Sequence, residues 1–308
     1  MRKIVVAGSL NMDLSVRVGH IPGAGETILG GALLESPGGK GANQAYAASK
    51  VASGSAVVML GCVGHDEFGR EMLRNLGRAG CDVSHVESLP GPSGVALIVV
   101  SDEGENAIVV APGANALFTA AMAANAAAVL EGADALLLQL EIPLETVKTL
   151  ATEARKRGVR VILDPAPVPA HGLPDDILQL ADIITPNETE AATLTASTEK
   201  KVTPEVATQM AEQLSAKGCK AVVLKLGARG SLIYETGHAT FVPAPKVNVV
   251  DTTAAGDVFN GALAVGLSEG FELSEACWFA TRAAALSVTR KGAQLSAPSR
   301  EEVDEFKP

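Results

Sequence analysis

Residues 135–163 read ALLLQLEIPLETVKTLATEARKRGVRVIL, and they indicate the class of fold to expect. A run that is apolar except for Gln139 covers 135–140, a second one that is apolar except for Arg160 covers 159–163, and a helical pattern over 144–157 lies between them. Short, nearly continuous apolar runs are typical of strands buried on both faces. A buried strand, a helix and a second buried strand form the unit from which parallel sheets are built.

The same alternation of strands and helices continues along the chain in both directions. Expected strands cover 4–7, 56–62, 135–140, 159–163, 183–184, 221–226, 231–235 and 239–242. Expected helices cover 42–51, 67–79, 119–131, 144–157, 205–217, 255–269 and 274–289. The sequence therefore predicts an α/β fold with a doubly wound, mostly parallel central sheet and helices on both faces.

Four other segments alternate apolar and polar residues, as the strands of a one-sided sheet do. These segments are 14–18, 27–35, 94–101 and 106–111. We expect one domain over 1–308, with a small β-sheet lid inserted as two pieces, about 12–37 and 93–112.

Composition excludes several classes of protein. Of the 308 residues 47% are hydrophobic and 19% are charged, which rules out global disorder. The net charge of −10 disfavours a nucleic-acid partner and an anionic membrane surface. The four cysteines form no Cys-x-x-Cys pair, so a zinc cluster is unsupported. With no signal-peptide pattern and no long apolar span, we expect a cytoplasmic protein.

Residues 251–257, which read DTTAAGD, precede the expected helix 255–269. Small residues at a helix start let backbone N–H groups approach an anion, and Asp257 beside them could accept a proton from a hydroxyl group. The alternative is that Thr252 and Asp257 only cap the helix. Neither a P-loop nor a dinucleotide-binding glycine motif occurs in the chain.

Polar residues also follow the expected strands, at the edge where open α/β sheets bind ligands. They are Asn11, Asp13, Glu141, Asn187 and Glu190. Residues 38–43, which read GGKGAN, add Lys40 and Asn43 as groups that could reach a polyhydroxylated ligand. Taken singly, each of these residues is as typical of a turn or a solvated loop.

Together, GGKGAN at 38–43, NETE at 187–190 and DTTAAGD at 251–257 resemble the ribokinase/PfkB family of sugar kinases. The resemblance extends from residues 8–11 to 290–294 and is strongest to the ribokinase branch of the family. It implies ATP-dependent phosphorylation of D-ribose at the 5-hydroxyl, giving ribose 5-phosphate and ADP. A kinase for 2-deoxyribose, another sugar or a nucleoside remains an alternative, as does a catalytically silent sensing protein.

The resemblance also implies roles for individual residues. Asp257 would be the base, and the N–H groups of Ala254, Ala255 and Gly256 would form an anion hole. The sugar would be held by Asn11, Asp13, Gly39, Lys40, Asn43, Glu141 and Asp257. ATP would be contacted by Asn187, Lys225, Gly227, Ala228, Arg229, Gly230, Gly256 and Thr281. Lys225 stands where threonine is frequent and Thr281 where histidine is common, so contacts to the nucleotide would differ locally.

Cations and a partner chain are implied in the same way. Magnesium would accompany ATP, organised by Asn187 and Glu190 largely through water. Potassium would act as an activator, enclosed by Asp251, Thr253, Ser287, Arg290, Gly292 and Ser296. The alternative is that Asp251 caps the helix or pairs with Arg290 and no ion binds. The lids would join two chains into a homodimer.

Overall fold

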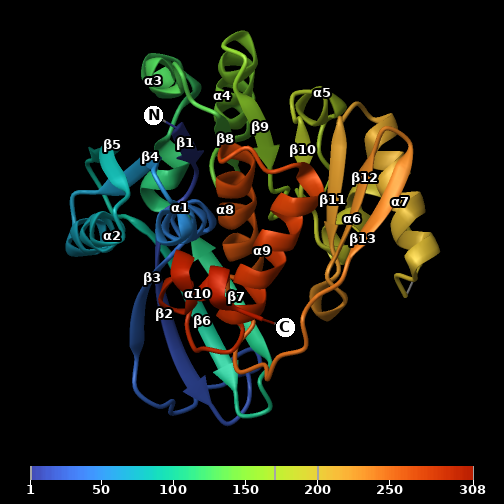
Figure 1. The fold of residues 1–308 in the computed structure, drawn as a ribbon. Coiled ribbons are helices and arrows are strands. Elements are labelled where there is room, and N and C mark those ends of the chain that lie inside the picture. The colour runs from blue at the N-terminus through green and yellow to red at the C-terminus, as the bar shows by residue number, and fades with distance from the viewer. Residues whose placement is uncertain (1, 170, 200, 308) are drawn as a thin grey trace.

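The computed structural model of the chain describes residues 2–169, 171–199 and 201–307. Within these residues a nine-stranded sheet forms the centre of the molecule, in the order β13-β12-β11-β10-β9-β8-β1-β4-β5 (Figure 1). Its strands are β1 (Arg2–Ala7), β4 (Ser55–Gly64), β5 (Asp82–Leu89), β8 (Ala135–Leu138), β9 (Arg160–Leu163), β10 (Ile183–Ile184), β11 (Ala221–Lys225), β12 (Ser231–Glu235) and β13 (His238–Val242).

The sheet is parallel from β5 to β11, and the β11–β12 and β12–β13 pairs at one edge are antiparallel. The chain moves outward from β1 to β4 and β5, and then returns to add β8 on the other side of β1. Ligands of open α/β sheets bind where the strand order reverses in this way, outside the carboxyl ends of the strands. The predicted doubly wound fold is confirmed, and its crevice lies beyond β1 and β8.

Helices cover both faces of the sheet (Figure 1). One face is covered by α1 (Lys40–Val51), α2 (Glu67–Arg78), α8 (Ala255–Ser268), α9 (Leu273–Ser287) and α10 (Arg300–Glu305). The other is covered by α3 (Ala120–Ala126), α4 (Leu144–Lys156), α5 (Asp175–Leu178), α6 (Glu188–Thr195) and α7 (Pro204–Ala216). Because side chains alternate along a strand, Ile4 and Val6 pack with the first group while Val5 and Ala7 pack with the second.

A separate four-stranded sheet, in the order β3-β2-β6-β7, lies at one end of the molecule (Figure 1). It contains β2 (Asn11–Val18), β3 (Leu34–Gly38), β6 (Gly94–Ser101) and β7 (Asn106–Ala111). Since β2 begins four residues after β1 ends, this small sheet starts at the crevice of the large one.

Two predicted elements were wrong or incomplete, and one strand was missed. The strand expected over 27–35 is instead β3 at Leu34–Gly38, because residues 30–31 make only a single backbone contact to β2, from Gly31 to Arg17. Strand β5 was missed, since this edge strand is largely exposed and carries no apolar run. The helix expected over 119–131 is divided into α3 and the 3₁₀ helix η2 (Ala127–Leu130).

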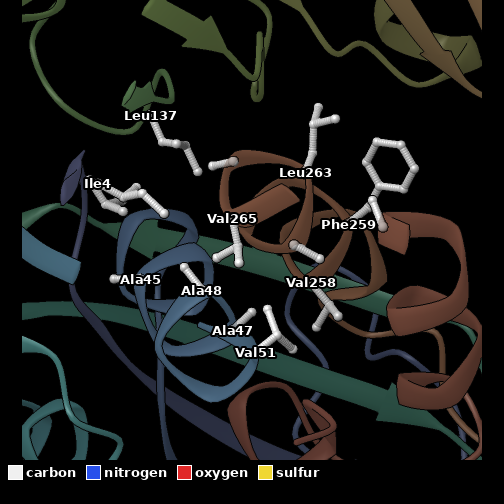
Figure 2. Packing of buried hydrophobic residues seen from close by; sticks show 14 of the residues in the cluster. Ile4, Ala45, Ala47, Ala48, Val51, Leu137, Val258, Phe259, Leu263 and Val265 are labelled. Carbon is white, nitrogen blue, oxygen red and sulfur yellow. The ribbon is translucent and has the colours of Figure 1, made fainter. Parts of the chain in front are cut away.

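The contact between α1 and α8 positions the crevice residues. Figure 2 shows Ala47, Ala48 and Val51 of α1 beside Val258 and Val265 of α8. The two helices approach so closely that a Cβ added to residue 261 would lie 2.7 Å from the Gln44 carbonyl oxygen and 2.8 Å from the Ala48 nitrogen. Only glycine permits this distance, and it brings the start of α8 against the start of α1.

Cys62, Cys81, Cys219 and Cys277 are all buried thiols without a disulfide. Burial raises the pKa of Cys62 to about 12, so the thiol stays protonated at neutral pH. Across the part of the chain that the structure describes, no helix combines the length and the apolar character that a membrane crossing requires.

Candidate active site

Asp257 lies in the first turn of α8 and is 7% exposed. Its two carboxylate oxygens accept hydrogen bonds from the side-chain amides of α1: Asn43 donates to Oδ2 over 3.0 Å and Gln44 donates to Oδ1 over 3.1 Å. The carboxylate is therefore held in a fixed orientation at the crevice, as a proton acceptor must be.

Asp257 has a pKa of about 6, raised above the usual range. The main cause is burial, which disfavours the charged carboxylate. The positive charge of Lys40 opposes this shift, and the negative charge of Asp164 adds to it. Burial alone would lower the pKa of Lys40, but the carboxylates of Asp257, Asp164 and Glu141 outweigh it and raise the pKa. At pH 7 Asp257 is therefore ionised, and its pKa is close enough to neutrality for efficient proton transfer.

Two residues that the sequence analysis did not select complete this network. The side-chain amide of Gln44 donates to Asp164 over 2.9 Å as well as to Asp257. The side-chain oxygen of Gln44, Oε1, accepts from the Gln139 amide over 2.6 Å. Asp164 follows directly after β9 and is 2% exposed. The rule that selected Glu141, a polar residue at the carboxyl end of an apolar strand, would also have found Asp164.

The side chain of Asn43, predicted to contact the sugar, also has two partners within the protein. Its amide donates to Asp257, and its oxygen accepts from Gln294, which in turn accepts from Asn75 over 2.5 Å. Both ends of the Asn43 side chain thus have protein partners, which fixes the orientation of Asp257. The connection from α2 to Asn43 runs through Gln294 near the C-terminus, a contact that sequence spacing could not reveal.

Acidic and amide groups line the side of the crevice that is next to the small sheet. Glu141 accepts from the Ser9 hydroxyl over 2.5 Å and from the Lys40 backbone N–H over 3.0 Å. Asn11 is buried and accepts from Asn115 over 2.8 Å. Burial, with the nearby charges of Glu141 and Asp257, raises the pKa of Asp13 to about 7.

Gly39 brings these groups together at the start of α1. Its φ of 88° is in the left-handed region, and an added Cβ would lie 2.7 Å from the backbone nitrogen of Asn11. A residue with a side chain would therefore be strained and would also clash with the turn after β1. The structure places Asn11, Asp13, Gly39, Lys40, Asn43, Glu141 and Asp257 around one crevice, as their assignment to a common site requires.

The first turn of α8 faces a polar cavity of about 440 Å³. Ala254, Ala255, Gly256 and Asp257 line it, opposite Lys40, Asp164, Asn187, Glu190 and Lys225. The first N–H groups of a helix lack partners within the helix and attract anions. Ala254 has a φ of 59°, a strained value for a residue other than glycine, and such strain is found at functional sites. The N–H of Ala255 donates to the Thr252 carbonyl over 3.2 Å.

A second cavity of about 470 Å³ adjoins the first and is mainly apolar. Val247, Val249, Phe259, Ala284, Ala285 and Val288 line it, together with Gly227, Ala228, Gly230 and Thr281. The Thr281 hydroxyl is buried there without a hydrogen-bond partner among the described residues. An apolar cavity with an unpaired polar atom is suited to an aromatic ring that carries hydrogen-bonding groups.

Arg229 is the predicted nucleotide residue that lies apart from both cavities. Its guanidinium pairs with Glu188 over 2.5 Å and also donates to the Val202 carbonyl. Its side chain is 45% exposed, as expected for a surface ion pair. We therefore do not count it among the groups that face the two cavities.

Asn187 and Glu190 form a capping box at the start of α6. The Asn187 side chain accepts from the Glu190 N–H, and the Glu190 carboxylate accepts from the Asn187 N–H, each over 2.8 Å. Burial raises the pKa of Glu190, an effect that Lys225 opposes and Asp164 reinforces. The carboxylates of Glu190 and Asp164 thus face the polar cavity, and Mg²⁺ is commonly bound by one or two carboxylates, substrate phosphates and water. These residues fit a magnesium ion carried by a nucleotide.

Asp251 connects the loop before α8 to the loop after α9. One carboxylate oxygen accepts from the N–H and hydroxyl of Thr253, and the other accepts from the Gly292 N–H over 2.9 Å. Burial alone would raise the pKa of Asp251, but the hydrogen bonds from Thr253 and Gly292 outweigh it and hold the pKa below its usual range. Arg290 pairs with Glu302 over 2.5 Å, so its pairing with Asp251, the alternative raised from the sequence, is wrong.

The predicted potassium residues lie just before α8 and from the end of α9 onward, the two segments that Asp251 joins. Ser287 and Ser296 are buried, and their hydroxyls donate to the carbonyls of Ala284 and Ala293. Among the described residues, no group of three or more His, Cys, Asp or Glu side chains forms a metal site. Neutral oxygens with one carboxylate fit a large monovalent cation better than a divalent one.

Comparison with known proteins agrees with this geometry. The pfkB family of carbohydrate kinases matches residues 1–300 of the chain. The chain belongs to this family. The ribokinase of Bacillus subtilis is 42% identical over 307 residues, which cover 99% of both chains. A deoxyribokinase of Salmonella typhi is 37% identical over 304 residues, which cover 98% of both chains. The family assignment identifies the chain as a carbohydrate kinase.

The fold also matches a solved structure over nearly its whole length. The structure of Arabidopsis thaliana ribokinase complexed with ribose and ATP superposes with a TM-score of 0.90 and 34% identity, covering 99% of both chains. In this pfkB carbohydrate kinase, the two adjoining cavities lie at the carboxyl ends of the parallel strands. Asp164 after β9, Asn187 after β10 and Lys225 at the end of β11 line the polar one.

Proposed function

We propose that this carbohydrate kinase transfers the γ-phosphoryl group of ATP to the 5-hydroxyl of D-ribose, giving ribose 5-phosphate and ADP. Asp257 takes the proton from the 5-hydroxyl as the bond from O5 to phosphorus forms, and the bond from phosphorus to the bridging oxygen of ADP breaks. The N–H groups at the start of α8 stabilise the negative charge on the transferred group.

The observation that carries the proposal is that Asp257 lines the polar cavity, and that this cavity shares Ala255 and Gly256 with the adjoining apolar one. The polar cavity contains Lys40, Asp164 and Glu190, while the adjoining cavity is apolar and contains the unpaired hydroxyl of Thr281. This arrangement suits a nucleotide with its base in the apolar cavity and its phosphates in the polar one, while Asp13 and Glu141, whose charges lie close to Asp257, suit a polyhydroxylated sugar. A silent sensing protein would not need a buried carboxylate whose pKa lies near neutrality.

Asp13, Asn11 and Glu141 favour ribose over 2-deoxyribose. Asp13 is a partly buried carboxyl group with a raised pKa, and it needs a hydrogen-bond partner in the complex. A sugar hydroxyl supplies that partner, whereas a deoxy position leaves the group unpaired. A site built to hydrogen-bond a hydroxyl discriminates strongly against an analogue that lacks it.

Two cations belong to the proposal. Glu190, Asn187 and Asp164 would hold the magnesium ion that accompanies ATP, and this ion reduces the negative charge of the phosphates when bound. Asp251, Thr253, Ser287, Gly292 and Ser296, together with the backbone of Arg290, would hold potassium. Because Asp251 joins the loop before α8 to the loop after α9, an ion there would stiffen the segment that carries Ala254 and Gly256.

We further propose a homodimer in which the small sheets meet. Strand β7 is an edge of its sheet, and its Ile108, Val109 and Val110 are 53%, 66% and 43% exposed. An apolar edge strand has unpaired backbone groups that favour pairing with another strand. The need for ATP and the four free thiols support a location in the cytoplasm.

The test is release of ADP, measured by a coupled assay, with ribose, 2-deoxyribose, other pentoses, hexoses and nucleosides as acceptors. We expect ribose to give the highest kcat/KM, and the phosphorylated position can be identified by ³¹P–¹H NMR. A higher kcat/KM for 2-deoxyribose or a nucleoside would overturn the choice of substrate. If none of these acceptors supported the release of ADP, the proposed reaction itself would be overturned.

A further inference from the structure

One buried side-chain amide beside the crevice is held at both of its ends by backbone groups. Asn115 lies in the 3₁₀ helix η1 (Gly113–Leu117), which follows strand β7, and it is 1% exposed. Its Oδ1 accepts from the Leu10 N–H over 3.0 Å, and its Nδ2 donates to the Leu10 carbonyl over 3.0 Å. Because a backbone N–H can only donate and a backbone carbonyl can only accept, these two bonds fix the orientation of the Asn115 amide.

The second N–H of the Asn115 amide then determines the orientation of a neighbouring amide. It donates to Oδ1 of Asn11 over 2.8 Å. Since Asn115 offers a donor at this position, Asn11 must turn its oxygen toward Asn115 and its nitrogen away from it. Gly94 leaves room for this bond, because a Cβ added there would lie 2.2 Å from the Asn11 oxygen and 2.3 Å from the Asn115 nitrogen.

The nitrogen of the Asn11 side chain is directed toward the crevice. Asn11 and Asp13 are two residues apart on β2, so their side chains lie on the same face of the strand, and Asp13 is close to Glu141 and Asp257. Within residues 2–169, 171–199 and 201–307, no group accepts a hydrogen bond from Asn11 Nδ2, although Asn11 is only 2% exposed. A buried amide donor without a partner in the protein is suited to a ligand that accepts from it.

This donor complements the two carboxyl groups beside it. When ionised, Asp13 and Glu141 can accept the proton of a hydroxyl group, but they cannot donate to its oxygen. The Asn11 N–H supplies the missing donor, so the three side chains can satisfy both the proton and the oxygen of sugar hydroxyl groups. With the opposite orientation, Asn11 would present a third acceptor and leave a hydroxyl oxygen unpaired.

We propose that Asn115 is a positioning residue for sugar recognition, which sets the Asn11 amide as a hydrogen-bond donor to one oxygen of the sugar. All polar atoms of the Asn115 side chain are used within the protein, so it acts through Asn11. This inference rests on the proposed binding of a sugar in the crevice, and it does not depend on ATP. The residues that it links are 104 positions apart in the sequence.

Binding of sugar without nucleotide tests the assignment, measured by titration calorimetry on the full chain with ribose and its 1-, 2- and 3-deoxy analogues. Asn115→Asp keeps an acceptor for the Leu10 N–H and loses both N–H donors. Asn11 should then reverse its amide to donate to the new carboxylate, which turns its oxygen toward the sugar. We expect ribose to bind about 10- to 100-fold more weakly, as for a lost hydrogen bond whose partner stays buried.

Selectivity among the deoxy analogues separates a change of orientation from general damage to the site. In the unchanged protein, the analogue that lacks the oxygen facing Asn11 should bind at least about tenfold more weakly than ribose. In Asn115→Asp this ratio should shrink at least about threefold, while the ratios for the other two analogues stay the same. If the affinities for ribose and all three analogues fell by the same factor, the assignment would be overturned.

Asn11 gives a second arm of the test, in which Asn115 is intact. Asn11→Asp keeps the acceptor for Asn115 but replaces the nitrogen that faces the sugar, so it should weaken ribose binding about as much as Asn115→Asp. This arm holds even if Asn115→Asp does not fold, because Asn11→Asp changes only the side chain at the crevice. Full ribose affinity in Asn11→Asp would show that Asn11 is not a donor to the sugar.

A double variant tests whether Asn115 acts through Asn11. In Asn11→Ala the amide is already absent, so adding Asn115→Asp should change the ribose affinity by less than about twofold. A further loss of about tenfold or more in the double variant would assign Asn115 a structural role that is independent of Asn11.

Asn125→Asp is the matched control, because it adds the same charge at an exposed position of α3, the helix that follows η1. It should leave all four affinities unchanged. If the unchanged protein bound none of the four sugars, the proposed function would fail and this inference with it. If the unchanged protein bound ribose and Asn115→Asp kept its full affinity and selectivity, only this inference would fail.

Discussion

Asp257 is the residue on which the proposed reaction depends most. Asp257→Asn keeps the size of the side chain and one acceptor oxygen, but it cannot take up a proton. We expect kcat to fall by about 10²- to 10⁴-fold, the usual contribution of a general base. Ribose affinity by calorimetry and the thermal unfolding midpoint should stay near those of the unchanged protein. A kcat near the original value would show that another group accepts the proton.

The pH dependence of kcat/KM follows from the same carboxyl group. Asp257 must be ionised to act, and its pKa is about 6, so kcat/KM should fall roughly tenfold per pH unit below pH 6. Lys40 lowers this pKa, because its positive charge favours the carboxylate. Lys40→Met should therefore move the acid limb of the profile to higher pH, in addition to any loss of sugar binding.

The position of the acid limb separates this effect from a simple loss of affinity. Lys50 lies at the other end of α1, far from the first turn of α8, and Lys50→Met is the matched control that should leave the limb in place. An unchanged limb in Lys40→Met would mean that Asp257 does not control the acid side of the profile.

For individual residues, the sequence predicted which polar groups follow the strands and start the helices, but it did not predict which hydrogen bonds link them. Asp257, Lys40 and Glu141 could be selected because helix starts and strand ends are visible as patterns. The bond from Gln294 to Asn43 joins residues 251 positions apart, and no local pattern predicts it. Asp164 could have been selected by the rule that found Glu141, whereas its pairing with Lys225 over 2.9 Å required the strand order of the sheet.

Among the elements, the two loops joined by Asp251 decide how the start of α8 is held. We expect turnover in buffer free of sodium and potassium to rise when potassium is added at constant ionic strength. Potassium should also raise the thermal unfolding midpoint, since an ion held by both loops binds only the folded chain. Equal turnover with and without potassium would refute the site.

Two substitutions at Asp251 distinguish the ion from the hydrogen bonds. Asp251→Ala loses both, whereas Asp251→Asn keeps an acceptor for Thr253 or Gly292 and loses the charge. We expect activation by potassium to be lost in both, with a higher basal rate in Asp251→Asn. Asp102→Ala, at the tip between β6 and β7, is the matched control and should keep the full activation.

Elements were predictable where burial imposes a pattern. Strand β8 is apolar throughout and β9 is apolar after its first residue, Arg160, because helices cover both faces of the sheet. Helix α4 between them shows a regular apolar stripe. Strand β5 is exposed along most of its length, so packing imposes no pattern on it. Strand β3 contains Pro37, which has no backbone N–H. Because β3 is an edge strand, the missing donor leaves no neighbouring strand without a partner.

For the whole molecule, the central question is what covers the apolar edge of the small sheet. Strand β7 has β6 on one side and ends the sheet on the other, and its exposed Val109 lies on that edge. A dimer with two-fold symmetry brings the same strand of both chains together, so one substitution acts twice. In the proposed dimer each small sheet would be held by its partner over the sugar, which would restrict the entry of water into the crevice.

Light scattering at micromolar concentration should therefore give the mass of two chains. Val109→Lys introduces two like charges into the proposed interface, and we expect the dimer to dissociate at least tenfold more readily. Because Val109 is 66% exposed in one chain, the substitution should leave the unfolding midpoint of the monomer unchanged. Phe241→Lys, at the exposed edge strand β13 of the other sheet, is the matched control and should leave the dimer intact. A monomer in the unchanged protein would refute the assembly, whereas a dimer that survives Val109→Lys would move the interface away from β7.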